Sequence, residues 1–360
     1  MDASIEALIR LIKAMPSAEA SDLHLVPGYR PMYRIHGELT RTAEAEVGNG
    51  AVVRLLEAIA PPEIPAKLAQ DTDLDFAIQI ADGAGSFGRF RINVFASRGD
   101  FGACLRAVPE RIPGLAELGF PVELADRIVA LNSGLVLVTG ATGSGKTTSI
   151  AAMLQIMNAR GGCRIITVEE PVEYLYPRSE AGLVTQREVG ADVPSFYDGL
   201  RYGLRQDPDV MLVGEIRDRQ TAQLAVSGAE TGHLIFATLH ATDAKGAVTR
   251  LVDLFPPEQH DDIRTQLSMS LRYVIVQHLL PAEGGGRRVL ALEVMMANFA
   301  VRSAVRQGKM ENLESAMQSG RKDGMFTLDT DLKRLFLEGR ISLETARSLA
   351  KDPAEIGAAR

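Results

Sequence analysis

The residue types best suited to chemistry stand at 134–147, in the stretch GLVLVTGATGSGKT. An apolar run leads into Gly140, and Gly145 follows after four intervening residues. Lys146 and Thr147 come next, and then an apolar, helix-compatible segment. In this order of strand, glycine-rich loop and helix, backbone N–H groups and the positive end of the helix dipole surround phosphate oxygens. The spacing therefore predicts a P-loop that binds a nucleotide.

Lys146 and Thr147 have separate tasks in such a loop. A lysine at this position reaches the β- and γ-phosphates, and the hydroxyl group of the following threonine binds Mg²⁺. We therefore expect a nucleotide with its Mg²⁺ ion at the end of this strand. A fortuitous glycine turn is the alternative, and the strand and helix on either side argue against it.

Three carboxylates stand at or just after the end of the next apolar strand, RIITVE at 164–169. They are Glu169, Glu170 and Glu173, in the stretch ITVEEPVEYL. Because the carboxyl ends of neighbouring strands in such a sheet converge on the phosphates, these side chains have a place beside the nucleotide. There they would orient an attacking water molecule or bind Mg²⁺. The alternative is an exposed acidic loop.

A further apolar strand ends in a carboxylate, within DPDVMLVGEIRD at 207–218. Glu215 is placed as in a Walker B arrangement, in which an acidic side chain binds Mg²⁺ through a water molecule. The residue here is Glu, where many P-loop enzymes have Asp. A core strand followed by a polar turn would give the same pattern, but its position after the P-loop favours a role in the site.

Two histidines, His233 and His240, flank the apolar segment LIFATL in ETGHLIFATLHATD. They are a weak zinc candidate, because no Cys or Asp stands at ligand spacing beside them. A histidine at a strand end could instead sense the γ-phosphate or orient a catalytic glutamate, and a purely structural histidine is the alternative.

Arginines gather on or beside two adjacent predicted strands near the end of the first third of the chain. The sequence GRFRINVFA at 88–96 and the strand at 102–108 carry or flank Arg89, Arg91, Arg98 and Arg106. Their pattern fits either a solvated sheet face or a surface directed at phosphates.

The segments around these motifs divide the chain into two types of pattern. Residues 1–110 read as an α+β domain with a first helix near residues 5–12, helices at 50–60 and 63–69, and strands at 22–26, 31–37, 73–80, 88–96 and 102–108. From 134 onward, apolar strands alternate with helices, which is typical of a parallel sheet covered on both faces. Those strands are predicted at 135–139, 164–169, 210–214 and 234–239, after a helix at 121–132.

The last hundred residues are predicted to be mainly helical. Helices are expected at 258–280, around 298–318, at 327–338 and at 342–351, with a strand in RVLALEVM after the glycine loop 284–286. We therefore expect an N-terminal domain over 1–108, a proline- and glycine-punctuated linker over 109–120, an α/β domain over 121–297 and a helical region over 298–360.

The bulk composition is that of a globular protein, with 360 residues, 46% apolar residues and 24% charged residues. The length suits two domains. A net charge of −7 argues against a nucleic-acid-binding surface. Cys104 and Cys163 lack CxxC spacing, so we expect small residues buried in strands, with no disulfide and no zinc site. No apolar run approaches a membrane span and the N-terminal segment lacks a signal-peptide core, so we expect a cytoplasmic protein without membrane insertion.

Together the four motifs resemble those of the secretion ATPase superfamily, and within it the PilT type of pilus retraction motor. GATGSGKTT at 140–148 is similar to the Walker A box, and TVEEPVEY to the aspartate box. DPDVMLVGEIRD is similar to the Walker B box, and AETGHLIFATLHATD to the histidine box. The resemblance implies a RecA-like P-loop ATPase core that binds ATP and Mg²⁺. The nucleotide-binding residues it implies are Gly140, Ala141, Thr142, Gly143, Ser144, Gly145, Lys146, Thr147 and Thr148.

The resemblance extends over nearly the whole chain. SDLHLVPGYRPMYRIHGEL at 21–39 is similar to the family's N-terminal opening and implies a PAS-like domain, and TLDTDLKRLFLEGRIS at 327–342 resembles the retraction subfamily's C-terminal segment. By position, Glu173 matches the catalytic glutamate that serves as base for the attacking water, and Glu215 matches the Walker B glutamate. His233 and His240 match the two histidine-box residues. The segment around GRFRINVF resembles the one that supplies charge-stabilising arginines, here Arg91, Arg98 and Arg106.

The family also implies an assembly and a task. It suggests a homohexameric ring that powers type IV pilus retraction and twitching motility, bound to an inner-membrane platform protein at the inner face of the cytoplasmic membrane. An arginine that reaches a neighbour's γ-phosphate would tie hydrolysis to the geometry between subunits.

Two departures from the family pattern leave alternatives open. The aspartate box has Glu170 where Asp is usual, and the retraction signature AIRNLIRE stands here as AVRSAVRQ at 300–307, with Ser303, Ala304 and Gln307 replacing Asn, Leu and Glu. An accessory retraction ATPase of the PilU type is therefore one alternative. An assembly or type II secretion ATPase is another, but those enzymes generally carry a four-cysteine zinc module, which two cysteines cannot form.

Overall fold

The computed structural model describes residues 2–357 except 36, 69–70, 83–84, 109–110 and 287, with the backbone alone at 81–82 and 85–87. The chain divides into two compact units, Met1–Arg111 with Glu173–Leu175, and Ile112–Val172 with Tyr176–Arg360. The main division falls inside the linker expected over 109–120. That segment also contains a short helix, α4 (Leu115–Leu118), whose first residue is buried.

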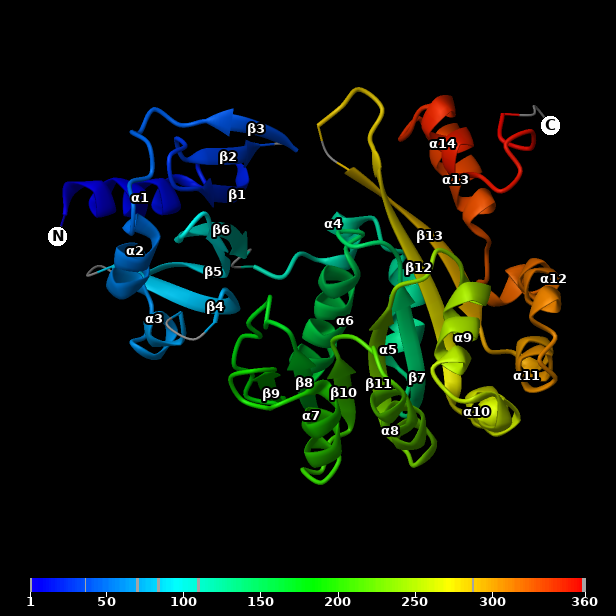
Figure 1. Cartoon of the computed structure of the whole chain (residues 1–360). Helices are drawn as coiled ribbons and strands as arrows, with labels where there is room; N and C mark the ends of the chain where they lie inside the picture. Colours follow the sequence, from blue (N-terminus) through cyan, green and yellow to red (C-terminus); the bar gives the residue numbers. More distant parts are fainter. Residues whose placement is uncertain are drawn as a thin grey trace. The chain divides into compact units, whose positions relative to one another are not determined.

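The N-terminal unit is a six-stranded sheet in the order β3-β2-β1-β6-β5-β4, and all its paired neighbours run antiparallel. Its helices pack on the sheet through one apolar cluster, which confirms the predicted α+β domain (Figure 1). The elements are α1 (Ala3–Ala14), β1 (Ala20–Leu25), β2 (Met32–Ile35), β3 (Glu38–Arg41), α2 (Ala51–Ile59), α3 (Glu63–Lys67), β4 (Asp73–Asp82), β5 (Gly85–Ser97) and β6 (Asp100–Val108).

Side-chain alternation along β5 decides which face of that sheet carries the arginines. Phe90, Ile92 and Val94 are buried in the core of the unit. Arg91 stands between them in sequence, so its side chain points to the opposite face. Because Arg91 is the Cα partner of Arg106 in the β5–β6 pair, both arginines lie side by side on the face away from the core.

The second unit is built on a seven-stranded sheet in the order β13-β12-β7-β11-β10-β8-β9. All its neighbouring strands are parallel except the β12–β13 pair. The P-loop strand β7 therefore lies inside the sheet, as expected for a RecA-like core. Its first elements are α5 (Val122–Val129), β7 (Gly134–Thr139), α6 (Lys146–Arg160), β8 (Arg164–Glu169), β9 (Leu183–Glu188), α7 (Phe196–Gly203), β10 (Val210–Val213), α8 (Arg219–Glu230), β11 (Leu234–Leu239) and α9 (Ala244–Asp253).

Both faces of this sheet are covered, as the continuous apolar strands predict. Leu135 and Leu137 of β7 pack in a cluster with α7, α8 and α9. Val136 and Val138 point the other way and pack with α5 and α6. The strand is thus buried on each side, and the P-loop follows at its carboxyl end, between β7 and α6.

The helix predicted over 258–280 is wrong in its second half. Helix α10 (His260–Ser270) ends at Ser270, and β12 (Leu271–Pro281) follows directly, parallel to β7 and antiparallel to β13 (Arg288–Met296). The segment contains β-branched Val274, Ile275 and Val276, which are fully buried. A run that is apolar on both faces has no period that separates helix from strand, and here the β-branched residues decide for the strand.

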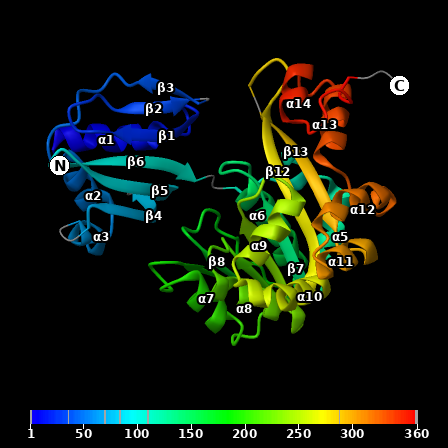
Figure 2. The same cartoon turned by 45° about the vertical axis from the view of Figure 1, so that its right-hand side comes forward.

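The rest of the C-terminal region is helical, as predicted, and belongs to the same compact unit as the sheet. Its α-helices are α11 (Phe299–Arg306), α12 (Leu313–Ser319), α13 (Leu328–Leu337) and α14 (Leu343–Leu349). Helices α11 and α12 join the cluster on one face of the sheet, and α13 and α14 pack against residues at the far end of the β12–β13 hairpin. Figure 2 shows these helices alongside the hairpin.

Besides β12, two further strands among the described residues were not predicted, β3 and β9, and both lack a strong apolar pattern. All four residues of β3 are exposed, and β9 is an edge strand without a buried residue. The expectation for the cysteines holds in part. Both are free and only partly buried, and Cys104 lies in β6, whereas Cys163 precedes β8.

Candidate active site

The P-loop closes tightly because its glycines take conformations that other residues avoid. Gly143 and Gly145 have φ values of 77° and 88°, in the left-handed region. Gly140 has a φ of 141°, and a Cβ atom there would lie 2.3 Å from the carbonyl oxygen of Gln277 in β12. The loop is therefore pressed against β12, a strand that the sequence had not revealed.

Lys146 begins helix α6 and turns its side chain back over the loop. Its Nζ donates to the carbonyl oxygens of Gly140 at 2.9 Å and Ala141 at 3.0 Å, and the residue is 9% exposed. A cation held at the mouth of a loop of backbone N–H groups adds positive charge where phosphates bind.

The loop fits a phosphate group in two further respects. Ser144 is 4% exposed, and its Oγ has no hydrogen-bond partner in the described part of the chain. The open turn at Gly143 would admit a Cβ without contact within 4 Å, so the backbone there is accessible to a ligand. Thr147 follows Lys146 in the first turn of α6, and its binding of Mg²⁺ stays a prediction.

The Walker B strand and the histidine-box strand deliver Glu215 and His240 to the same edge of the sheet. Glu215 follows β10 and His240 follows β11, the neighbouring parallel strand. His240 Nε2 lies 3.3 Å from Glu215 Oε1, and the two side chains are 37% and 20% exposed. The structure thus brings together two residues that the sequence places 25 positions apart.

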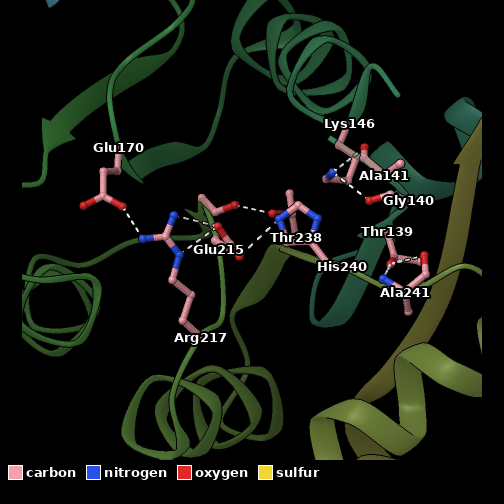
Figure 3. Close-up of polar contacts among 11 residues, drawn as sticks. Thr139, Gly140, Ala141, Lys146, Glu170, Glu215, Arg217, Thr238, His240 and Ala241 are labelled. Carbon is pink, nitrogen blue, oxygen red and sulfur yellow. Dashed lines mark hydrogen bonds and ion pairs between the residues drawn. The ribbon is translucent and has the colours of Figure 1, made fainter. Parts of the chain in front are cut away.

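Arg217 joins this pair to the aspartate box. Its Nε donates to Glu215 Oε2 at 2.8 Å, and its Nη1 donates to Glu170 Oε2 at 2.6 Å. Figure 3 shows the row from Glu170 through Arg217 to Glu215 and His240. Burial alone would lower the pKa of Arg217, but the hydrogen bonds and charges of the two carboxylates outweigh it and raise that pKa. The guanidinium group also lies 5.8 Å from the ring centroid of Phe196.

Backbone contacts fix the segments that carry these side chains. Thr238 Oγ1 donates to the carbonyl oxygen of Gly214, and the Ile216 N–H donates to the Thr238 carbonyl at 3.0 Å. Thr139, the last residue of β7, exchanges two hydrogen bonds with Ala241, of 2.7 and 3.0 Å. These hydrogen bonds therefore fix the segments that follow β10 and β11 relative to each other and to the end of the P-loop strand β7 (Figure 3).

The three carboxylates of the aspartate box have different surroundings. Glu169 is 5% exposed and accepts from Thr167 Oγ1 at 2.6 Å and from Gln186 Nε2 at 3.2 Å, so it ties β8 to β9. Glu170 faces Arg217, as described above. Glu173 is half-buried and groups with the N-terminal unit, so its role as catalytic base stays a prediction.

His233 lies at the opposite end of β11 from His240. It precedes Leu234, whose Cα partner is Gly134 at the start of β7, so about 20 Å of strand separates the two histidines. Its Nδ1 lies 3.0 Å from the carbonyl oxygen of Gly228, near the end of α8. Within one chain the structure gives His233 a contact with a helix end and does not bring it to the P-loop.

The three predicted arginines fall into two places in the N-terminal unit. Arg106 Nε donates to Asp22 Oδ1 at 2.8 Å, and its neighbour Arg91 lies 3.9 Å from Asp75. Arg98 is exposed in the β5–β6 turn with a φ of 54°, about 20 Å along the hairpin from Arg91. Their action on phosphate stays a prediction.

Sequence reasoning missed Arg217 and Gln277. Arg217 stands two residues after Glu215, and that proximity within GEIRD was the signal available. Gln277 contacts Ser149 of α6 through a 2.7 Å hydrogen bond from Nε2, and nothing local in the sequence pointed to it. In the described ranges, no group of three or more His, Cys, Asp or Glu residues is placed to hold a metal ion. No helix there is long and apolar enough to cross a bilayer.

Comparisons with known proteins show the family and the fold of the chain. The family model described as Type II/IV secretion system protein matches residues 2–323. The type IV pilus retraction ATPase PilT of Pseudomonas aeruginosa is 42% identical over 334 residues, which are 93% of this chain and 95% of that protein. The type IV pilus ATPase PilU of the same organism is 34% identical, over 94% of this chain and 87% of its own length.

A solved structure shares the whole fold. The crystal structure of the pilus retraction motor PilT with bound ADP matches with a TM-score of 0.86 and 39% sequence identity. The match covers 97% of this chain and 98% of that chain. The predicted fold class, a P-loop core with a smaller N-terminal domain and C-terminal helices, is confirmed.

Proposed function

The chain belongs to the type II/IV secretion system protein family, and from this premise we propose that it is an ATP-hydrolysing motor that powers type IV pilus retraction. The observation that carries the proposal is the 42% identity to a pilus retraction ATPase over almost the whole of both chains. The convergence of Lys146, Glu215 and His240 at one edge of the sheet gives that similarity a chemical basis.

ATP hydrolysis needs charge neutralisation and a base for the attacking water. Lys146 is held at the P-loop by two carbonyl oxygens and would exchange these for phosphate oxygens. Glu173 would accept the proton of the attacking water. Thr147, and Glu215 through water, would hold Mg²⁺, which when bound neutralises negative charge on the phosphates.

His240 and Arg217 would set the direction of the Glu215 side chain. One carboxylate oxygen of Glu215 faces His240 and the other faces Arg217, so both are occupied from the protein side. A carboxylate held in this way points in one direction, and preorganised charge is the main means by which such sites stabilise phosphoryl transfer.

We further propose a homohexameric ring, in which arginines of the N-terminal unit stabilise charge on a phosphate of the same or a neighbouring subunit. Arg91 and Arg106 form one candidate pair, and Arg98 a separate candidate at the hairpin turn. Because these two locations lie apart along the hairpin, single substitutions of the arginines can test each location separately. The ring would dock on an inner-membrane platform protein from the cytoplasmic side.

The accessory motor of the PilU type remains the second candidate, because AVRSAVRQ departs from the retraction signature. The residues of this segment lie in and just after α11, whose buried face consists of Val301, Ala304 and Val305. The departures Ser303 and Gln307 are hydrogen-bonded to each other at 3.1 Å and alter the polar face, whereas the third departure, Ala304, lies on the buried face. The higher identity to PilT than to PilU favours the retraction motor.

Deletion of the gene in its source organism tests the proposal directly. Loss of a retraction motor should leave cells with more surface pili and without twitching motility. Loss of an accessory motor should leave twitching reduced but present, with little change in pilus number. Cells without pili would refute retraction and indicate an assembly ATPase.

A further inference from the structure

A buried carboxylate on β13 has no part in the chemistry described above. Glu293 is 3% exposed, and a carboxylate so deeply buried is costly unless hydrogen bonds satisfy it. It lies in β13, a strand of the second unit. Its partners therefore show what the fold uses it for.

Glu293 accepts hydrogen bonds from the first residues of two different helices. Oε1 accepts from the Ala244 N–H at 2.7 Å, and Oε2 accepts from the Leu328 N–H at 3.3 Å. Ala244 begins α9 and Leu328 begins α13. The first N–H groups of a helix have no acceptor within it, and a negative charge there is favourable.

Both helices already have N-cap residues of their own. Asp243 accepts from the Gly246 N–H at 2.6 Å, and Thr327 accepts from the Thr330 N–H at 3.4 Å. Glu293 is therefore not needed as an ordinary cap of either helix. Its distinctive property is that one rigid side chain holds the starts of α9 and α13 at a fixed separation.

The start of α9 is also the end of the histidine-box segment. That segment runs from His240, which faces Glu215, to Ala244, which Glu293 binds. In between, Ala241 is bonded to Thr139 directly before the P-loop. An unbroken series of short contacts thus leads from the P-loop through residues 240–244 to Glu293 and on to α13.

A second contact joins the same segment to the C-terminal helices. Lys351, after α14, places its Nζ 3.5 Å from Asp243 Oδ2. The N–H groups of Lys351 and Asp352 both donate to the Asp329 carboxylate in α13, each at 2.9 Å. The end of α14 therefore holds the N-cap of α9 and the first turn of α13 together.

We propose that Glu293, assisted by Lys351, is a positioning residue that couples the histidine-box segment at the nucleotide site to the C-terminal helices α13 and α14. A nucleotide that moves His240 would then move the start of α13, and a load on α13 would in turn alter the site, because coupling between two sites is reciprocal. The inference rests on the proposed function, since it assigns the nucleotide to the P-loop.

Hydrogen–deuterium exchange of the full-length protein, with and without saturating ADP, tests this coupling without requiring hydrolysis. In the wild type, ADP should change the exchange rate of the peptide that contains Leu328 by at least about fivefold, the lower end of typical coupling. In Glu293→Gln, which replaces one of the two acceptor oxygens by an NH₂ donor, the change should fall to less than about twofold. Exchange at the P-loop should still respond to ADP.

Asp331→Asn is the matched control. Asp331 is 4% exposed and accepts from the Leu292 N–H at 2.8 Å and from Arg334, and neither partner belongs to the histidine-box segment. This variant should lose a buried carboxylate yet keep the ADP response at Leu328. An equal response at Leu328 in the wild type and Glu293→Gln would overturn the proposal, and so would loss of the response in Asp331→Asn.

Kinetics provide the second readout. Glu293→Gln should lower kcat for ATP about three- to tenfold at an unchanged KM, because the P-loop contacts remain intact while His240 loses its distant support. A rise in KM at constant kcat would contradict a positioning role. If Glu293→Gln does not fold, Lys351→Met carries the exchange test, and an undiminished ADP response at Leu328 in that variant would overturn the proposal. Absence of ADP binding in the wild type would instead refute the proposed function.

Discussion

The second unit contains two pairs of acidic residues in opposite circumstances. Glu170 and Glu215, at the phosphate-facing edge of the sheet, are 39% and 20% exposed and share one arginine. Glu293 in β13 and Asp331 in α13 are 3% and 4% exposed, and each accepts a hydrogen bond from a backbone N–H group. The first pair is bound by a long side chain within reach of water, whereas both members of the second accept from the main chain and Asp331 accepts from Arg334 as well.

The partly exposed pair can exchange its partners, whereas the buried pair fixes the positions of the elements around it. An exposed ion pair contributes little net stability and is easily replaced by another ionic contact. A buried carboxylate that loses its donors is left uncompensated, which costs several kcal/mol. We therefore expect the contacts of Glu170 and Glu215 with Arg217 to adjust when a nucleotide and Mg²⁺ bind, while the buried pair keeps its contacts throughout.

Glu215→Gln should break the first half of this comparison with the largest effect. Loss of the charge weakens the contacts with Arg217 and His240, because Gln keeps only one acceptor oxygen, and it weakens the proposed water-mediated Mg²⁺ contact, so we expect kcat to fall about 100-fold or more. Steady-state ATP hydrolysis with Mg²⁺ measures this. Glu338→Gln is the control, because Glu338 is likewise a partly exposed carboxylate paired with an arginine, Arg334. Its activity should match the wild type.

Arg217→Ala should have a smaller effect on the same region. The variant removes a charge-assisted contact to each carboxylate, and we expect kcat to fall roughly tenfold, as for the loss of about 1.5 kcal/mol. Arg217→Lys should recover only part of the activity, because lysine lacks the planar fork that spans both acids. Arg160→Ala is the control, because Arg160 forms a similarly exposed ion pair with Asp126, and this variant should remain fully active. Reduced turnover in Arg160→Ala would show that the effect of Arg217→Ala is not specific to the site.

The buried pair predicts a pH effect on stability with a definite sign. Burial raises the pKa of Glu293 above 4.5, although the Ala244 N–H and Lys351 oppose the shift and Asp243 adds to it. Glu293 therefore keeps its proton to a higher pH in the folded state than in the unfolded state. This contribution to stability is complete below the unfolded pKa and is lost as the pH rises through the folded pKa.

Glu293→Gln should remove that dependence. The melting temperature of the variant, relative to the wild type, should rise as the pH increases from 4 toward 7, because only the wild type must ionise a buried acid. A difference in melting temperature between the variant and the wild type that stays constant over this pH range, or that decreases with increasing pH, would contradict the assignment. The same comparison with Asp331→Asn should give the same sign, since burial also raises the pKa of Asp331.

How far the sequence predicted this structure depends on whether the information is local. The P-loop, the Walker B strand and the alternation of strands and helices follow from contiguous spacing and were predicted correctly. The strand at Leu271–Pro281 was not, because an apolar segment with neighbours on both faces shows no period. Its partners β7 and β13 lie elsewhere in the chain, so only pairing in the fold decides between a helix and a strand at this segment.

The candidate site divides in the same way. The pairing of Glu215 with His240 was anticipated in kind, since strand ends converge in a parallel sheet. The separation of His233 from that edge follows from the length of β11 and could have been calculated from the predicted strand. The contacts of Arg217 with Glu170 and of Glu293 with two helix starts depend on loops whose courses no spacing reveals.

The central claim, that this chain hydrolyses ATP through the P-loop and Glu173, is tested most directly by turnover of the assembled protein. We predict Mg²⁺-dependent ATP hydrolysis by the wild type, and loss of most of it in both Lys146→Ala and Glu173→Gln. Glu173→Gln should still bind ATP, because it removes only the base. Wild-type turnover no higher than that of the two variants, measured on assembled protein, would contradict the account.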